Sequence, residues 1–347
     1  LPPPPAAPEL PPPPSRRRWP VLQQMAKSYL SNLLHFATTS ATDVDTAMVV
    51  AESIEKVAPF YAAFAAVARS TLRLLLQWWS GQGVESTAPA LRVAAFIAIR
   101  RMAIVLPRPF IELCMKGVYL TYVRNSKFTS ATTASSIRFL ANGVVEMWGL
   151  EELQKHVEEK RNASGDGGGS SSSGGGGTGT AYRLAFVYIR QLAIHLRTAL
   201  TLKTVEAQKN VYNWQFLHSL RVWSLVLAAY ADDVLLQQLV YPLTQVLIGV
   251  LRVAPASKYI PLRLHCVRAL NLMARHCSYF INTTPMVLTV LESAEFRTAR
   301  GDGGGSRSGS GGGDDGDDGA GDGGGIDGRK RRRGGRGGSG VGDGGRG

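Results

Sequence analysis

The sequence predicts an all-α protein, an irregular HEAT- or armadillo-like α-solenoid of stacked helical hairpins. Apolar residues recur at helical spacing through two long blocks, and proline and glycine fall at the junctions between these stretches. No stretch alternates apolar and polar residues over the length of a useful β-strand. Consecutive amphipathic helices with short connections pack most simply as antiparallel pairs. Because no clean repeat consensus is visible, we expect the stack to be irregular.

Composition divides the 347 residues into five segments. Two of them, 21–162 and 181–298, are rich in Leu, Val, Ala and aromatic residues and are long enough to share one core, so the second block is expected to continue the solenoid of the first. The other three lack the apolar side chains that offset chain entropy, and we predict disorder for them. They are the Pro-rich lead 1–20, the Gly/Ser-rich loop 163–180 and the Gly-rich tail 299–347.

The first helix of the first block is expected to begin at Pro20, since proline at a first helical position gives up no hydrogen bond. It extends to about residue 36, and its apolar face is predicted to comprise Leu22, Met25, Tyr29, Leu33 and Phe36. Asp43 is the predicted N-cap of the next helix, which ends near residue 57.

A long apolar helix is then predicted from Pro59 to Trp79, ended by Gly81. The rest of the first block is expected to form helices over 90–106, 110–124 and 133–148. In the second block, helices are expected over 181–202, 213–230, 233–253, 258–279 and 284–295. Pro242 should kink or split the third of these near Tyr241. Polar residues and this proline interrupt the apolar run there, which favours a buried helix over a membrane span.

The helix over 182–200 combines two patterns. A stripe with helical period is predicted to pack in the core and consists of Ala185, Ile189, Leu192, Leu196 and Ala199. Arg183, Arg190 and Arg197 repeat every seven residues, which places them in a row about 10 Å apart on another side. This row is either a solvated face or a contact for RNA phosphate or an acidic partner helix, because guanidinium groups bind both anions bidentately.

The formal net charge is +13, and most of it falls on the two apolar blocks. Such a balance favours acidic partners. In the tail, a basic cluster is predicted to be a nuclear signal or a loose RNA-binding segment. It consists of Arg329, Lys330, Arg331, Arg332 and Arg333.

No constellation of residues predicts catalysis, a cofactor or a metal. The pairs His265–Cys266 and His276–Cys277 would lie roughly 16 Å apart on one continuous helix, whereas zinc ligands lie about 2 Å from the metal. Core cysteines and partly buried histidines are the expected alternative. His195 is expected to be a hydrogen-bonded structural histidine, and four aromatic residues are expected to be mostly core. These are Tyr188, Trp214, Phe216 and Trp223.

Several long strings resemble the nucleolar complex protein two family. They are LCMKGVYLTYVRNSKF (113–128), IRFLANGVVEMWGL (137–150), YIRQLAIHLRTAL (188–200), VYNWQFLHSLRVW (211–223), LVYPLTQVLIGVLRVAPASKYIPLRLHCVRAL (239–270) and FINTTPMVLTVLE (280–292). The resemblance covers most of 90–296. The Gly/Ser-rich loop and the Gly-rich tail depart from the family pattern, so a tail function is not carried over.

The resemblance implies a non-catalytic helical scaffold of ribosome biogenesis. Such a protein would form a heterodimer with another nucleolar complex protein on pre-60S particles, with possible pre-rRNA contact, and would aid their maturation and nuclear transport. It implies location in the nucleus, both nucleolus and nucleoplasm, and neither a membrane nor a small-molecule substrate. The alternative is a nuclear helical-repeat adaptor for chromatin, transcription regulation or transport, which the same solenoid would serve.

Overall fold

The computed structural model describes residues 19–39, 43–82, 88–151, 153–154, 179–253 and 259–292. Within these ranges the regular structure is helical and no β-strand occurs, so the all-α prediction is confirmed. The tail 299–347 and nearly all of the lead 1–20 and the loop 163–180 lie outside the described residues. Their predicted disorder and the segment boundaries therefore stay predictions.

The helices of the first block begin and end close to the predicted positions. Asp43 caps its helix as predicted, because its carboxylate accepts a hydrogen bond from the Thr46 backbone N–H at 2.8 Å. Gly81 ends another helix in the left-handed conformation, with φ 82°. The elements are α1 (Trp19–Thr39), α2 (Val44–Lys56), the 3₁₀ helix η2 (Ala58–Ala63), α3 (Ala65–Ser80), α4 (Pro89–Val105), α5 (Arg108–Asn125) and α6 (Ala134–Trp148).

The second block contains one helix that the sequence did not predict, α9, which Thr204 caps through its hydroxyl. The expected split near Pro242 is confirmed, since Gln238 and Leu239 separate two helices and the proline lies in the first turn of the second. The elements are α8 (Thr180–Leu202), α9 (Val205–Val211), α10 (Trp214–Ala229), α11 (Val234–Gln237), α12 (Val240–Val253), α13 (Ile260–His276) and α14 (Thr284–Leu291).

Two predictions for the first block are wrong in detail. The helix predicted from Pro59 to Trp79 is broken at Phe64, whose backbone (φ −132°, ψ 67°) separates η2 from α3. The break allows both Tyr61 and Phe64 to be buried. On α1, four of the five residues assigned to the core face are exposed, because α1 packs on α2 and α3 through Leu30, Ala37 and neighbouring residues instead. The exposed four are Leu22, Met25, Tyr29 and Phe36.

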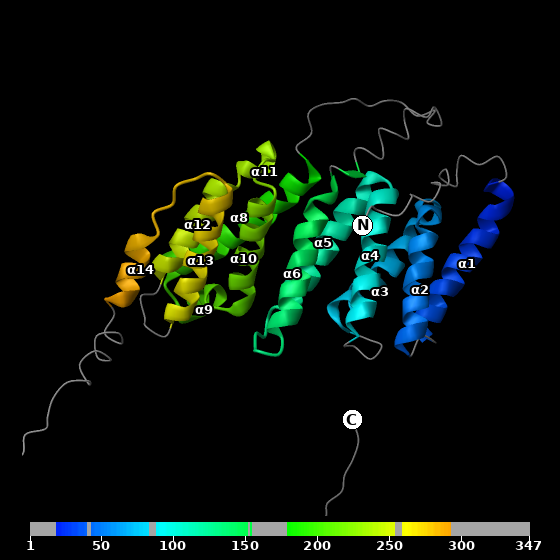
Figure 1. The fold of residues 1–347 in the computed structure, drawn as a ribbon, viewed down its shortest axis with the longest axis horizontal. Coiled ribbons are helices and arrows are strands. Elements are labelled where there is room, and N and C mark those ends of the chain that lie inside the picture. The colour runs from blue at the N-terminus through cyan, green and yellow to red at the C-terminus, as the bar shows by residue number, and fades with distance from the viewer. Residues whose placement is uncertain are drawn as a thin grey trace, which may run out of the picture. The chain divides into compact units, whose positions relative to one another are not determined.

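The helices pack in two rows (Figure 1). Successive members of α1, α3, α5, α8 and α12 contact one another. In the second row α2 contacts α4 and α10 contacts both α6 and α13, while α4 and α6 are joined by an ion pair between Arg100 Nε and Glu146 Oε1 at 3.2 Å. Contacts between the rows pair α3 with α4, α5 with α6, α8 with α10, and α12 with α13. Two such rows are what an α-solenoid requires, and the HEAT or armadillo class itself stays a prediction.

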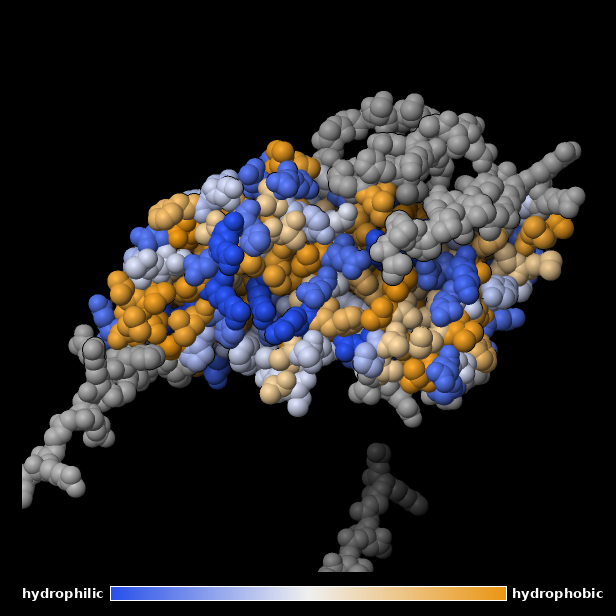
Figure 2. Space-filling model, viewed as in Figure 1, coloured by the Kyte–Doolittle hydropathy of each residue, from blue (hydrophilic) through white to orange (hydrophobic). Residues whose placement is uncertain are grey.

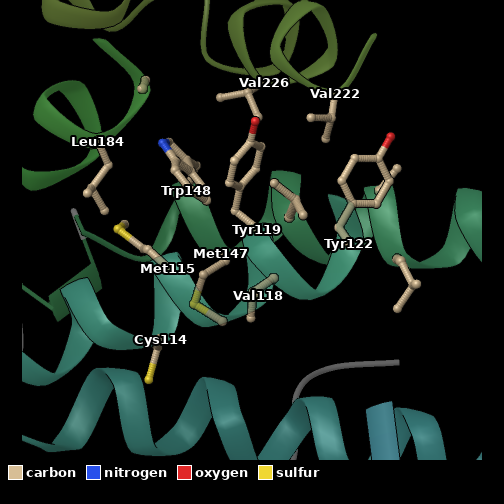
Figure 3. Packing of buried hydrophobic residues seen from close by; sticks show 14 of the residues in the cluster. Cys114, Met115, Val118, Tyr119, Tyr122, Met147, Trp148, Leu184, Val222 and Val226 are labelled. Carbon is tan, nitrogen blue, oxygen red and sulfur yellow. The ribbon is translucent and has the colours of Figure 1, made fainter. Parts of the chain in front are cut away.

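One aromatic cluster joins the two apolar blocks. Tyr119 of α5 and Trp148 of α6 face each other in the core (Figure 3), and Trp223 of α10 lies with its ring centroid 5.1 Å from each of theirs. The Trp223 indole N–H donates to the Tyr119 hydroxyl at 3.3 Å. The Trp148 indole N–H donates to the Ala181 carbonyl of α8 at 3.1 Å. The second block therefore packs directly on the first.

Val234–Val253 has the length and apolarity of a membrane span, and among the described residues it is the one stretch that does. Half of that window is buried inside the fold. Its buried residues pack against α8, α10 and α13, and the stretch is interrupted between α11 and α12. These contacts agree with the buried helix that the polar interruptions favoured.

Candidate interaction surfaces

The apolar stripe of α8 lies in the core as predicted. Ala185, Ile189, Leu192, Leu196 and Ala199 are all buried, and α8 packs on α5, α10 and α12. The approach of α12 depends on Gly249, where an added Cβ would lie 2.6 Å from the Leu196 Cδ2 atom. This packing fixes the rotation of α8 and therefore which of its residues face outward.

Arg183, Arg190 and Arg197 all lie on the exposed side of α8. They are not equivalent. Arg183 Nη2 lies 3.3 Å from Glu112 Oε2 of α5, and the same carboxylate accepts a hydrogen bond from Lys116 Nζ at 2.6 Å. Lys116 and then Arg183 hold the pKa of the Glu112 carboxyl below its usual value. Within the described part of the chain, Arg190 and Arg197 form no such ion pair.

Apolar side chains interleave with the arginines on the same side of α8. Phe186, Val187 and Ile194 are 43%, 56% and 46% exposed. A surface hollow of about 500 Å³ adjoins Phe186 and Val187, between α5 and the N-terminal half of α8. We call this surface the α8 outer face and define it by Arg183, Phe186, Val187, Arg190, Ile194 and Arg197. It is mixed apolar and basic, a composition that matches a protein partner with an acidic and an apolar side.

Trp214 is exposed, so the prediction that all four aromatic residues lie mostly in the core is wrong for this residue. Phe216 and Trp223 are buried and Tyr188 is partly buried, but Trp214 is 41% exposed. It is the first residue of α10, and its side chain lies against the ring of His218, with centroids 5.9 Å apart. The ring of His265, from α13, meets it edge-on at 6.1 Å.

Two exposed arginines lie near these rings: Arg221 of α10 acts on both histidines, and Arg268 lies one turn after His265 on α13. In the described ranges neither guanidinium forms an ion pair with a carboxylate. We call Trp214, His218, Arg221, His265 and Arg268 the α10–α13 cluster. This cluster was not identified from the sequence. The spacing of Trp214, His218 and Arg221 (i, i+4, i+7) places them on one side of a helix, but His265 and Arg268 follow after two intervening helices and no spacing connects the two sets.

The two histidines of the cluster are neutral at pH 7. Burial lowers the pKa of His218 to about 4, with smaller contributions from Arg221 and His265. Its Nε2 shares a hydrogen bond of 2.9 Å with the Thr129 hydroxyl. The pKa of His265 is lowered by burial and then by Arg221 and Arg268. The positive charge of the cluster at neutral pH is therefore carried by its arginines.

The other predicted residues lie apart from both surfaces or offer no chemistry. Cys266 and Cys277 are buried as predicted, whereas His265 and His276 are both exposed and not partly buried, because no helix of the described ranges covers that side of α13. Burial raises the pKa of the Cys266 thiol to about 12, so it is protonated at neutral pH. In the described ranges no group of three or more His, Cys, Asp or Glu residues could hold a metal.

His195 is exposed and its Nε2 shares a hydrogen bond of 3.1 Å with the Gln191 side chain, so the hydrogen-bonded histidine that we predicted is present. No nucleophile or carboxylate hydrogen-bonds to its ring in the described part of the molecule. The basic cluster Arg329–Arg333 lies outside the described residues, and its role stays a prediction.

Comparison with protein families matches the model of the Noc2p family over residues 109–157 and 177–308, more than half of the chain. The chain belongs to the Noc2p family. Its sequence is 33% identical over 278 residues to nucleolar complex-associated protein 2 of Arabidopsis thaliana and 32% identical over 279 residues to nucleolar complex protein 2 of Drosophila melanogaster. An uncharacterized NOC2 family protein of Schizosaccharomyces pombe is 27% identical over 284 residues.

The matches to the plant and fly proteins cover 80% of this chain but only 32% of those proteins, so the chain spans about a third of their length. The match to the fission yeast protein covers 79% of the chain and 36% of that protein. The family resemblance seen in the sequence is therefore confirmed. The α8 outer face and the α10–α13 cluster both fall within the part that matches the Noc2p family model.

Proposed function

We propose that this Noc2p-family chain is a non-catalytic scaffold for assembly of the large ribosomal subunit in the nucleolus. It pairs with another nucleolar complex protein on pre-60S particles, aids their maturation and nuclear transport, and is present in nucleolus and nucleoplasm. The plant and fly relatives are named nucleolar complex proteins, which supports this proposal. The two rows of helices support a scaffold, because side-by-side helices present extended outer surfaces.

The observation that carries the partner proposal is the composition of the α8 outer face. In the described ranges no carboxylate forms an ion pair with Arg190 or Arg197, and Ile194 lies exposed between them. A phosphate backbone would match the arginines but would leave the apolar side chains uncovered. An amphipathic acidic helix of a protein partner matches both, since its carboxylates reach the guanidinium groups while its apolar residues cover Phe186 and Ile194. We therefore assign the α8 outer face to a protein.

The test is affinity purification of the tagged chain from nuclei, followed by gradient sedimentation. The wild type should recover pre-60S particles and another nucleolar complex protein. The variant Arg190→Glu/Arg197→Glu should lose that protein, because two charges that attract the partner become repulsive. Arg183 is left unchanged, since its ion pair with Glu112 also joins α8 to α5.

The matched control is Arg69→Glu/Arg73→Glu, which reverses two exposed arginines on α3, in the same row of helices. This variant should retain the partner. Partner recovery that is unchanged by the α8 variant would remove the α8 outer face from the mechanism. Recovery of chromatin or transport factors without ribosomal precursors would replace the scaffold proposal with the nuclear adaptor.

A further inference from the structure

We propose that the α10–α13 cluster is a binding site for single-stranded RNA, with a base stacked on Trp214 and the adjoining phosphates held by Arg221 and Arg268. The site lies on the row formed by α6, α10 and α13, whereas the α8 outer face belongs to the other row. It is a second surface with a different kind of partner, and it stands independently of the protein contact proposed for α8.

The charge of the surface matches a polyanion. The most hydrophilic side chains in this view gather over α10 and α13 (Figure 2). Arg221 and Arg268 come from these two helices, and both lie beside His265. Neither guanidinium is engaged by a carboxylate in the described ranges, so both planar groups are available for bidentate contact with phosphate oxygens.

The aromatic part of the surface matches an unpaired base. Trp214 is 41% exposed although it is the largest apolar side chain at this end of α10. The rings of His218 and His265 pack against it and restrict its orientation. His218 is itself fixed by Thr129, and its carbonyl accepts a hydrogen bond from the Tyr122 hydroxyl at 3.0 Å. An indole held in one orientation and open to solvent is a stacking platform for a base.

The space beneath the tryptophan shows how the base would lie. A cavity of about 20 Å³ lies among Trp214, His218, Arg221 and His265. That volume admits one water molecule and no base, so the base stacks on the outer part of the indole and is not read in a pocket. Stacking of this kind is tolerant of sequence and requires an unstacked base. The ligand is therefore single-stranded RNA with little base preference, and a duplex should bind more weakly.

The surface differs from a protein-docking face in how its charge and apolar area are arranged. On α8 three exposed apolar residues alternate with the arginines, whereas in the cluster the exposed aromatic ring belongs to a surface to which α10 and α13 each contribute an exposed arginine. Stacking plus phosphate contact is the combination by which proteins bind single strands. An acidic protein segment would use the arginines but would gain little from a single ring.

The test measures binding of fluorescent oligo(U) RNA of about 20 nucleotides to the full 347-residue chain by anisotropy, at one fixed salt concentration. Trp214→Ala should weaken binding about 5- to 100-fold, and Trp214→Phe should restore most of it because a smaller ring still stacks. Arg221→Gln/Arg268→Gln should weaken binding about tenfold or more. The control Arg69→Gln/Arg73→Gln should change affinity less than about twofold, and thermal melts confirm that each variant folds.

Ultraviolet crosslinking separates this site from the basic tail. The proposal expects RNA attached to the peptide that contains Trp214, and loss of that crosslink in the presence of unlabelled oligo(U). Crosslinks confined to residues 299–347, with affinity unchanged in the Trp214 and arginine variants, would overturn it. Equal affinity for a duplex of the same length would also overturn it, as would an acidic peptide that binds the cluster while RNA does not. None of these results bears on the α8 outer face.

Discussion

The α8 outer face and the α10–α13 cluster are both basic and exposed, yet their neighbourhoods differ. On α8, Arg183 is paired with Glu112, and apolar side chains separate the remaining arginines. In the cluster, Arg221 and Arg268 come from different helices, have no carboxylate partner in the described ranges and lie near His265, which packs on an exposed tryptophan. The number of arginines does not distinguish the two surfaces. The residues between the arginines do.

This difference shows that a row of exposed arginines does not by itself identify the class of partner. The side chains around the arginines must be considered as well. A guanidinium that is already paired with a carboxylate binds another anion less strongly, because the existing ion pair must be broken first. Exposed apolar area favours a partner that can cover it, and an exposed ring with unpaired cations favours a stacked base and phosphate.

The largest effect is expected from Trp223→Ala, because both surfaces depend on the same core. Trp223 is fully buried and packs on Tyr119, Trp148 and Tyr188 of α5, α6 and α8. Its removal should lower the free energy of unfolding by about 3–5 kcal/mol. Urea unfolding measures the change. Trp214→Ala is the matched control and should cost less than about 1 kcal/mol, since that ring is partly exposed. Equal losses would mean that Trp214 is a core residue.

The two surfaces should separate in a double test of binding. Arg190→Glu/Arg197→Glu should reduce recovery of the protein partner about tenfold or more from nuclease-treated nuclear extract and leave oligo(U) affinity within about threefold. Arg221→Gln/Arg268→Gln should do the reverse. The measurements are quantitative immunoblotting and anisotropy on the same protein preparations. If either variant impairs both activities equally, the surfaces act as one and the contrast between them is wrong.

The salt dependence of RNA binding should count the phosphate contacts of the cluster. For single strands the slope of log affinity against log salt is about −0.7 per neutralised phosphate. Arg221→Gln/Arg268→Gln should therefore make the slope shallower by about 1.4, whereas Trp214→Ala should weaken binding with little change in slope. A titration at four salt concentrations gives both slopes. An unchanged slope in the arginine variant would place the phosphates elsewhere.

The smallest expected effect is a difference in acid stability. Because the pKa of His218 falls from 6.5 to about 4 on folding, the unfolded chain binds its proton first as pH falls, and stability should decrease from about pH 6.5 toward about pH 4. His265 acts in the same direction, and Arg221 faces both rings. Between about pH 6.5 and about pH 5.5 the loss is about 1 kcal/mol, which lowers Tm on the order of 2–4 °C.

The control for the pH experiment is His218→Gln, whose amide can still bond to Thr129 but does not titrate. It should remove part of the decrease between pH 6.5 and pH 4. Glu112, on the α8 side, contributes in a lower range, since its pKa is depressed and its stabilisation is lost only as pH falls below the usual carboxyl value. A variant with the same pH profile as the wild type would show that His218 does not titrate as described.

Much of the fold could be predicted because the signals are local. Asp43 and Gly81 act on backbone groups within a few residues, so capping and termination can be inferred from short spacings. The split near Pro242 could also be predicted, because the effect of a proline on a helix is local. The stripe on α8 was predictable because α8 is covered on one side only, so one period accounts for its burial.

The predictions failed where the local sequence was compatible with more than one backbone conformation or more than one buried face. Helix α1 carries apolar residues on two sides, and only its contact with α3 decides that Leu30 and Ala37 are covered while Met25 and Phe36 are not. The backbone leaves the helix at Phe64 so that Tyr61 and Phe64 can both enter the core. Trp214 has the composition of a core residue, and its exposure follows from its place at the end of α10.

Most helices, the terminating residues Asp43 and Gly81, the exposed arginine row and the family could be predicted from the sequence, because each depends on residues close together in the chain or on a continuous string. Only the packing of the helices places Glu112 against Arg183, 71 positions away, and brings Arg221 and Arg268 together near His265, whose ring contacts Trp214. Charge and stacking act through space at a few ångströms. Residues that are distant in the chain acquire such neighbours only when the helices pack.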